Sequence, residues 1–68
     1  MEADQLLNTK QAAELLNVPV GTLRWWRHLG DAGPKSFTLG SRKVMYRRSD
    51  VIAWIERQYA AADTKVAG

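Results

Sequence analysis

One short helix near the middle of the chain is expected at Pro19-Val20-Gly21-Thr22-Leu23-Arg24-Trp25-Trp26-Arg27-His28-Leu29-Gly30. Proline is favoured at the start of a helix and glycine just beyond its end. Gly21 is the one internal residue that disfavours a helix. The stretch therefore predicts a helix of about three turns, with a left-handed cap at Gly30.

The predicted helix has two different faces when its residues are placed at about 100° steps. The face that we expect to be buried is formed by Leu23, Trp26 and Leu29, with Thr22 at its edge. The opposite face carries Arg24, His28 and Gly21, flanked by Val20, Trp25 and Arg27. An exposed helix usually mixes acids with bases, yet this one has no acid before Asp31. We therefore expect the polar face to lie against a negatively charged partner.

The composition describes one small domain of 68 residues with a net charge of +3, no cysteine and a single histidine. Disulfides and thiolate metal sites are excluded, and His28 alone does not form a metal cluster. No Ser-His-Asp set or phosphate-binding glycine loop is present, so we expect neither enzymatic activity nor a cofactor. No apolar run approaches the roughly 20 residues of a membrane span, and no signal-peptide pattern opens the chain. The absence of cysteine suits a reducing cytoplasm.

The positive charge is concentrated in the middle of the chain. Residues 24–48 contain seven lysines and arginines and one acid, whereas the segments on both sides are net negative. This distribution favours a polyanion, most simply nucleic acid, as the partner.

A second helix is expected before the central one. Thr9 is a candidate N-cap, because its hydroxyl can accept a hydrogen bond from an amide two or three residues on. Ala12, Leu15 and Leu16 then recur at helical spacing and predict about two turns. The helix ends at Asn17-Val18-Pro19, since the residue before proline is disfavoured in a helix. This spacing is typical of a helix-turn-helix, whose second helix enters the DNA major groove. A plain helical hairpin has the same spacing, and the charge of the second helix favours the former.

A β-hairpin is expected after the loop at residues 31–34. Two β-prone segments, residues 36–39 and 44–46, are joined by residues 40–43, so the prediction is a four-residue loop between Leu39 and Val44. The expected apolar face consists of Phe37, Leu39, Val44 and Tyr46. Because a two-stranded hairpin is barely stable alone, it must pack on the helices. Its basic loop then projects as a wing beside the central helix.

A third helix closes the predicted domain. Ser49 is its candidate N-cap, and Asp50 lies in the first turn, where the helix dipole favours an acid. The apolar stripe is formed by Val51, Ile52, Trp54, Ile55 and Tyr59. We predict a flexible N-terminus at residues 1–5, a folded domain at 6–59, and a tail at 60–68 that frays or continues the last helix. The fold class is mainly α with a small two-stranded β-hairpin, a winged helix-turn-helix.

With these elements placed, the sequence resembles the excisionase family, within the superfamily of mercury-regulator-like DNA-binding domains. The matching residues are 6–16, Thr22-Leu23-Arg24, Trp26-Arg27, Leu39-Gly40, Tyr46-Arg47-Arg48-Ser49-Asp50-Val51 and Trp54. Residues 25–30 look like versions from mycobacterial phages. The chain departs from the family pattern at Gly21, which lacks a base-contacting side chain, and at Trp25, where a polar residue is usual.

The resemblance implies a recombination directionality factor without catalytic activity, working in the cytoplasm of a bacterial host. Such a protein binds and bends double-stranded attachment-site DNA and helps a tyrosine integrase excise a phage or mobile element. One helix and one wing cover only a few base pairs, so we expect several copies to bind cooperatively side by side. Two alternatives stay open: a small transcriptional regulator, and a protein-interaction module that docks a recombinase through Trp25 and the tail.

The candidate DNA-binding residues lie on the central helix and the wing. They are Thr22, Arg24, Trp25, Arg27 and His28 on the helix, Ser41, Arg42 and Lys43 in the hairpin loop, and Arg47 before the third helix. Helix N-termini present free amides to anions, which adds Thr9, Lys10, Val20 and Gly21 as candidate phosphate contacts. Arginine pairs bidentately with guanine, and for Arg24 base reading and phosphate contact both stay open. We expect Trp25 to be partly packed. The alternatives are that it covers the wing, stacks on a DNA sugar or contacts another protein.

Overall fold

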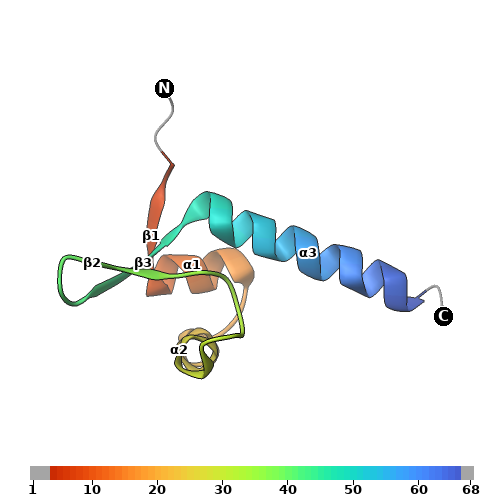
Figure 1. Cartoon of the computed structure of the whole chain (residues 1–68), viewed down its shortest axis with the longest axis horizontal. Coiled ribbons are helices and arrows are strands. Elements are labelled where there is room, and N and C mark those ends of the chain that lie inside the picture. Colours follow the sequence, from red (N-terminus) through yellow and green to blue (C-terminus); the bar gives the residue numbers. More distant parts are fainter. Residues whose placement is uncertain (1–3, 67–68) are drawn as a thin grey trace.

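The computed structural model describes residues 4–66. Its elements are, in order, β1 (Leu6–Asn8), α1 (Thr9–Leu16), α2 (Val20–Leu29), β2 (Phe37–Leu39), β3 (Lys43–Arg47) and α3 (Arg48–Val66). In Figure 1 the β2–β3 hairpin projects at one end of the molecule, and α3 extends toward the other. Three helices with a small antiparallel sheet confirm the expected mainly α, winged helix-turn-helix architecture.

The sheet contains one strand more than the predicted hairpin. Its order is β1-β3-β2, and both pairings are antiparallel. In β1, Leu7 lies opposite Tyr46, and both side chains are buried in the core. A strand of three residues is too short to show a period-two pattern, so no local signal in the sequence predicts it. By pairing with the outer edge of β3, β1 joins the wing to the helices.

The register of the hairpin differs by one residue from the prediction. Leu39 lies opposite Lys43, not Val44, so only residues 40–42 form the loop, with Gly40 at a φ of 69°. Because a one-residue shift moves a side chain to the other face of a strand, the expected apolar face is divided. Val44 and Tyr46 pack in the core, whereas Leu39 is exposed and shares the outer face with Phe37.

The cap of α1 is Asn8, and the expectation of Thr9 was wrong. The Gln11 amide donates to Asn8 Oδ1 at 2.7 Å, and the Asn8 amide donates to Gln11 Oε1 at 2.9 Å. This reciprocal pair is a capping box, in which a short polar residue is followed three positions later by glutamine. Asn8 ends β1 with an extended backbone, the conformation that an N-cap requires. Thr9 is instead the first helical residue.

Helix α2 begins and ends as expected, but its buried side is rotated. Pro19 is the N-cap and Gly30 the C-cap, with a φ of 89°. Leu23 is only 1% exposed, and Val20, which we placed beside the polar face, packs against the core. Leu29 is 48% exposed and lies outside the core, contrary to expectation. At about 100° per residue Leu29 is some 120° from Leu23, whereas Val20 is about 60° away on the other side.

Helix α3 begins at Arg48 directly after β3, so Ser49 is not its N-cap. The capping group comes from the N-terminal segment: Asp4 Oδ1 accepts from the Ser49 amide at 3.2 Å, and Asp4 Oδ2 accepts from the Ser49 hydroxyl. The Arg48 amide donates to the Gln5 carbonyl at 2.8 Å. The helix continues to Val66, and Tyr59 is 74% exposed.

Two tryptophans join α2, α3 and the loop between α2 and β2. Trp26 packs against the core, and its ring centroid lies 5.4 Å from that of Trp54 on α3. Gly33 has a φ of 75°, and a Cβ built there would lie 3.0 Å from Trp26. Pro34 beside it is buried. The indole of Trp26 therefore limits how closely the loop can approach α2, and any side chain at position 33 would be strained.

Candidate nucleic-acid interface

The outward face of α2 is centred on Gly21, Trp25 and His28. Trp25 is about 160° around the helix from Leu23, the most buried residue of α2, at 100° per residue. Its side chain is 57% exposed, and His28 is exposed as well. Trp25 thus lies in the middle of the polar face, and the contact that covers part of its side chain is with His28 on the same helix.

Trp25 and His28 stack on each other. Their ring centroids are 5.7 Å apart and their planes differ by 28°. Residues three apart in a helix lie on one side of it, so this contact runs along the outward face. The stack restricts the rotamers of a large exposed side chain.

Polar and open positions surround this stack. Arg24 is exposed on one flank, and Thr22 is half-buried near the core boundary. A Cβ built at Gly21 would meet no atom within 4 Å, so another molecule can approach the backbone there. The amides of Val20 and Gly21 belong to the first turn of α2, whose N–H groups lack helical acceptors and favour an anion.

The wing presents its cations at the end of the hairpin. Ser41, Arg42 and Lys43 are all exposed. Figure 1 shows the β2–β3 loop reaching beyond α1 and α2, away from the C-terminal half of α3. The one-residue change in register places Lys43 in β3 rather than in the loop, opposite Leu39. Arg42 and Lys43 are adjacent in sequence, but Arg42 lies in the loop and Lys43 is the first residue of β3.

Arg47 is held by an acid within the domain. Its Nε lies 2.8 Å from Asp4 Oδ2, and its side chain is 55% exposed. The hydrogen bonds from Ser49 and then the charge of Arg47 keep the pKa of Asp4 below its ordinary value of 3.8. Arg47 uses only its Nε–H in this contact, so the N–H groups of its two terminal guanidinium nitrogens remain as further donors. The ion pair with Asp4 sets the orientation of the guanidinium.

The N-terminus of α1 is partly occupied by its own cap. Asn8 takes the Gln11 amide, so the first-turn amides of Thr9 and Lys10 are the ones at which a phosphate contact is expected. Thr9 is half-buried and Lys10 is exposed.

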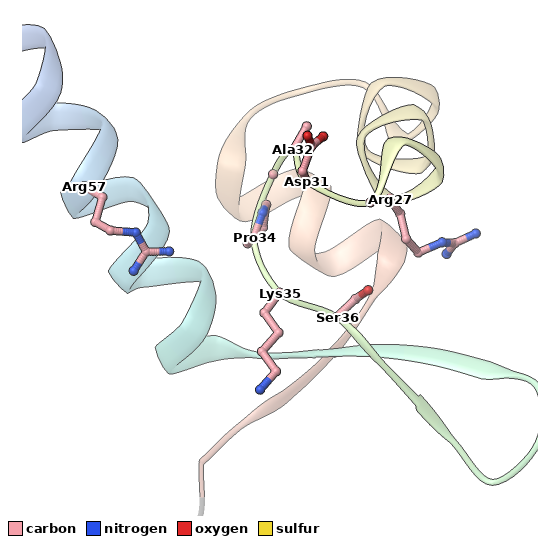
Figure 2. A pocket seen from close by; sticks show the side chains of 9 residues that line it. Arg27, Asp31, Ala32, Pro34, Lys35, Ser36 and Arg57 are labelled. Atoms are coloured by element: carbon pink, nitrogen blue, oxygen red, sulfur yellow. The ribbon is translucent and has the colours of Figure 1, made fainter.

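The structure also brings Arg27, already a candidate DNA contact, to one surface with two cations that were not candidates, Lys35 and Arg57. A cavity of about 380 Å³ lies between the end of α2, residues 30–36 and α3, and Arg27, Lys35 and Arg57 line it. In Figure 2, Arg57 extends from α3 toward the loop, whereas the guanidinium of Arg27 points away from α3. Lys35 and Arg57 are 22 positions apart in sequence, so only the packing of α3 on Trp26 puts them at one surface.

One core group next to this region is unusual. The hydroxyl of Tyr46 is buried and has no hydrogen-bond partner within the described residues. Burial raises the pKa of Tyr46, and the nearby positive charge of Arg27 opposes that rise. Arg27 therefore lies between the core and the basic surface.

Two site classes receive no support from residues 4–66. This part of the chain contains no group of three or more His, Cys, Asp or Glu side chains placed to hold a metal ion. Among its helices, none combines the length and apolar character needed to cross a membrane.

Comparison with known proteins identifies one family. A family model described as a helix-turn-helix domain matches residues 6–59, most of the chain. No curated protein and no solved structure matches the sequence. The match includes both helices of the motif, the wing and the part of α3 up to Tyr59.

Proposed function

Because this chain belongs to the helix-turn-helix domain family, we propose that it is an excisionase that binds and bends attachment-site DNA. A tyrosine integrase is the enzyme that it assists, and a phage or mobile element is what is excised. The helix-turn-helix domain indicates double-stranded DNA as the ligand. The excisionase role is the finer step, and the resemblance of residues 6–54 to that family supports it.

The observation that carries the proposal is the outward face of α2. It carries Arg24 on its flank and a backbone open at Gly21, and residues 20–29 contain no acid. Placed in the major groove, this face directs Arg24, Trp25 and His28 at base edges and leaves Thr22 and Arg27 near the phosphates. The wing residues Ser41, Arg42 and Lys43 then reach the adjacent backbone.

Further backbone contacts surround this core of the interface. The proposed set is Arg47, the helix starts at Thr9, Lys10, Val20 and Gly21, and the cavity cations Lys35 and Arg57. Such contacts position the protein without reading sequence. Each displaced counterion makes the affinity more dependent on salt.

Bending explains why several copies are expected. Smooth bending of a 20–30 base-pair site costs on the order of 1–6 kcal/mol, a large part of what one small domain gains from binding. Adjacent copies share this cost, so we propose cooperative side-by-side binding on repeated sites. The chemistry stays with the integrase, and the protein works on DNA in the bacterial cytoplasm.

The test compares DNA binding, bending and excision in one system. We expect affinity for attachment-site duplexes to exceed that for random duplexes, to fall steeply with salt, and to be accompanied by curvature that grows with occupancy. Arg24→Ala should weaken specific binding by about 1–3 kcal/mol if Arg24 reads a base, and excision by the cognate integrase should fall with it. The exposed Gln58→Ala on α3 is the matched control.

Two other outcomes would replace the proposal. Binding to a single operator without bending, with an effect on transcription alone, favours a transcriptional regulator. Association with a recombinase that is insensitive to salt, without affinity for duplex DNA, favours a protein-interaction module docked through Trp25.

A further inference from the structure

We propose that Trp25 reads the 5-methyl group of pyrimidines in the major groove: that of thymine, and equally that of 5-methylcytosine. This inference rests on the proposed function, because it requires α2 to enter the groove. It assigns to the exposed tryptophan a role in choosing the DNA sequence rather than a general contact with the backbone.

The position of Trp25 singles it out. It is the large apolar residue nearest the centre of the outward face of α2, opposite Leu23, and more than half of its side chain is exposed. Three tryptophans are present, and the other two are half-buried and pack against each other between α2 and α3. A helix that enters a groove with this face outward brings the indole of Trp25 close to the base edges.

The chemistry of the indole then selects the ligand. Tryptophan has a single N–H donor and no acceptor, so it can make one hydrogen bond to an acceptor, which every base pair presents in the major groove, and this bond alone does not distinguish the base pairs. Its surface is otherwise apolar. The apolar feature at base edges in the major groove is the C5-methyl group of thymine. Cytosine methylated at C5 carries the same group at the equivalent carbon.

The surroundings of Trp25 give a methyl group a defined place. The stack on His28, with centroids 5.7 Å apart, limits the orientations of the indole before DNA is bound. Gly21, one turn earlier, leaves open space beside it, and Leu29, one turn later, is about half exposed. Residues at i, i+4 and i+8 form one row along a helix. Gly21, Trp25 and Leu29 are therefore an apolar row with an open end, next to Arg24 and His28.

The test removes single methyl groups from DNA. In a duplex selected for tight binding, each thymidine is replaced in turn by deoxyuridine, which lacks only the methyl, and Kd is measured at constant salt. For the wild-type chain we expect one or two positions at which the replacement weakens binding about fourfold, the factor for one buried methyl group. The same group can be added at a cytosine. Where Trp25 contacts a deoxycytidine paired with guanine, replacing that deoxycytidine by 5-methyldeoxycytidine should strengthen binding by a similar factor.

Protein variants assign the effect to Trp25. Trp25→Ala and Trp25→Gln should bind random duplexes nearly as well as the wild type and should lose the sensitivity to deoxyuridine. Arg24→Ala and Tyr59→Ala should keep it, Tyr59 being an exposed aromatic on α3. Because methyl groups also change DNA stiffness, only the difference between wild type and the Trp25 variants counts.

The outcomes separate this inference from the proposed function. Specific binding with no sensitivity to any deoxyuridine overturns the role of Trp25 and leaves DNA binding intact. Sensitivity that persists in both Trp25 variants assigns the methyl group to another residue and also overturns the inference. If the wild-type chain shows no specific affinity for any duplex, the proposed function itself fails.

Discussion

Arg47 and Asp4 are 43 positions apart in the sequence, and Arg47 Nε donates to Asp4 Oδ2 at 2.8 Å. The same carboxylate accepts from the amide and the hydroxyl of Ser49 in the first turn of α3. One residue of the N-terminal segment therefore caps α3 and orients an arginine of the candidate interface. The N-terminal segment thus contributes both to the capping of α3 and to the position of Arg47, a candidate DNA contact.

Asp4 should make stability depend on pH. Its pKa is lowered in the folded state, so its contribution is present above the ordinary value of 3.8 and is lost as the pH falls through the lower folded value. We expect Asp4→Asn to lower the Tm at neutral pH and to have little effect well below pH 3.8. Thermal unfolding of both proteins across this range checks the prediction. Glu14→Gln, another exposed acid, is the control, and an equal loss at every pH would contradict the role of the charge.

The adjacent tryptophans should differ sharply in their effect on stability. Trp26 contacts the core, Trp54 and the Gly33 loop, so Trp26→Ala should lower the free energy of unfolding by about 3–5 kcal/mol, as for other packed tryptophans. Trp25→Ala should change it by less than about 0.5 kcal/mol, because the side chain faces solvent. Urea unfolding measures both. A larger loss at Trp25 would show that the phase of α2 is wrong.

Alanine substitutions at two glycines should separate effects on stability from effects on DNA binding. Gly21→Ala should raise the free energy of unfolding by about 0.5–1 kcal/mol, since the position is helical and open. If the α2 backbone approaches DNA there, affinity should nevertheless fall. Gly33→Ala should destabilise by about 1 kcal/mol or more, because the added Cβ meets Trp26 at 3.0 Å with φ at 75°. If Gly21→Ala binds DNA as tightly as the wild type, the α2 backbone does not approach DNA closely at this position.

The wing should act through charge alone. Replacing Arg42 and Lys43 by alanine should weaken binding to specific and random DNA alike, because both contacts are expected to be with phosphates. The slope of log Kobs against log salt should become shallower by about 2. The exchange Arg42→Lys with Lys43→Arg keeps the charge and should keep the slope. Equal affinity of the alanine variant and the wild type at every salt concentration would place the wing outside the interface.

The buried hydroxyl of Tyr46 should be dispensable for folding. It has no partner within the described residues, so Tyr46→Phe removes a desolvated polar group without loss of a hydrogen bond. We expect the free energy of unfolding to stay the same or rise by about 1 kcal/mol. Tyr59→Phe, at an exposed position, serves as the reference in chemical denaturation. A marked loss of stability in Tyr46→Phe would mean that the hydroxyl is hydrogen-bonded in solution.

Local sequence determined the helices, the turn between the first two of them and the position of the hairpin. Pro19 and Gly30 delimit α2 because their backbone preferences act within one or two residues. Asn17 ends α1 with a φ of 61°, a conformation that asparagine tolerates. The excess of positive charge in residues 24–48 could also be predicted from the sequence, because it follows from counting the charged residues.

Tertiary structure decided what depends on residues distant in the chain. Strand β1 exists because β3 offers its outer edge, and Asp4 caps α3 because that pairing brings the N-terminal segment to Ser49. Trp25 and Leu29 are exposed because of the side of α2 that the other elements cover. The hydrophobic periodicity of the sequence predicts the direction of the buried face only to within about 60° around the helix axis. Contacts across long loops carry no local sequence pattern. Such contacts contribute free energy only once the elements pack together, and so the exposed surface that forms the candidate interface is set by the tertiary structure.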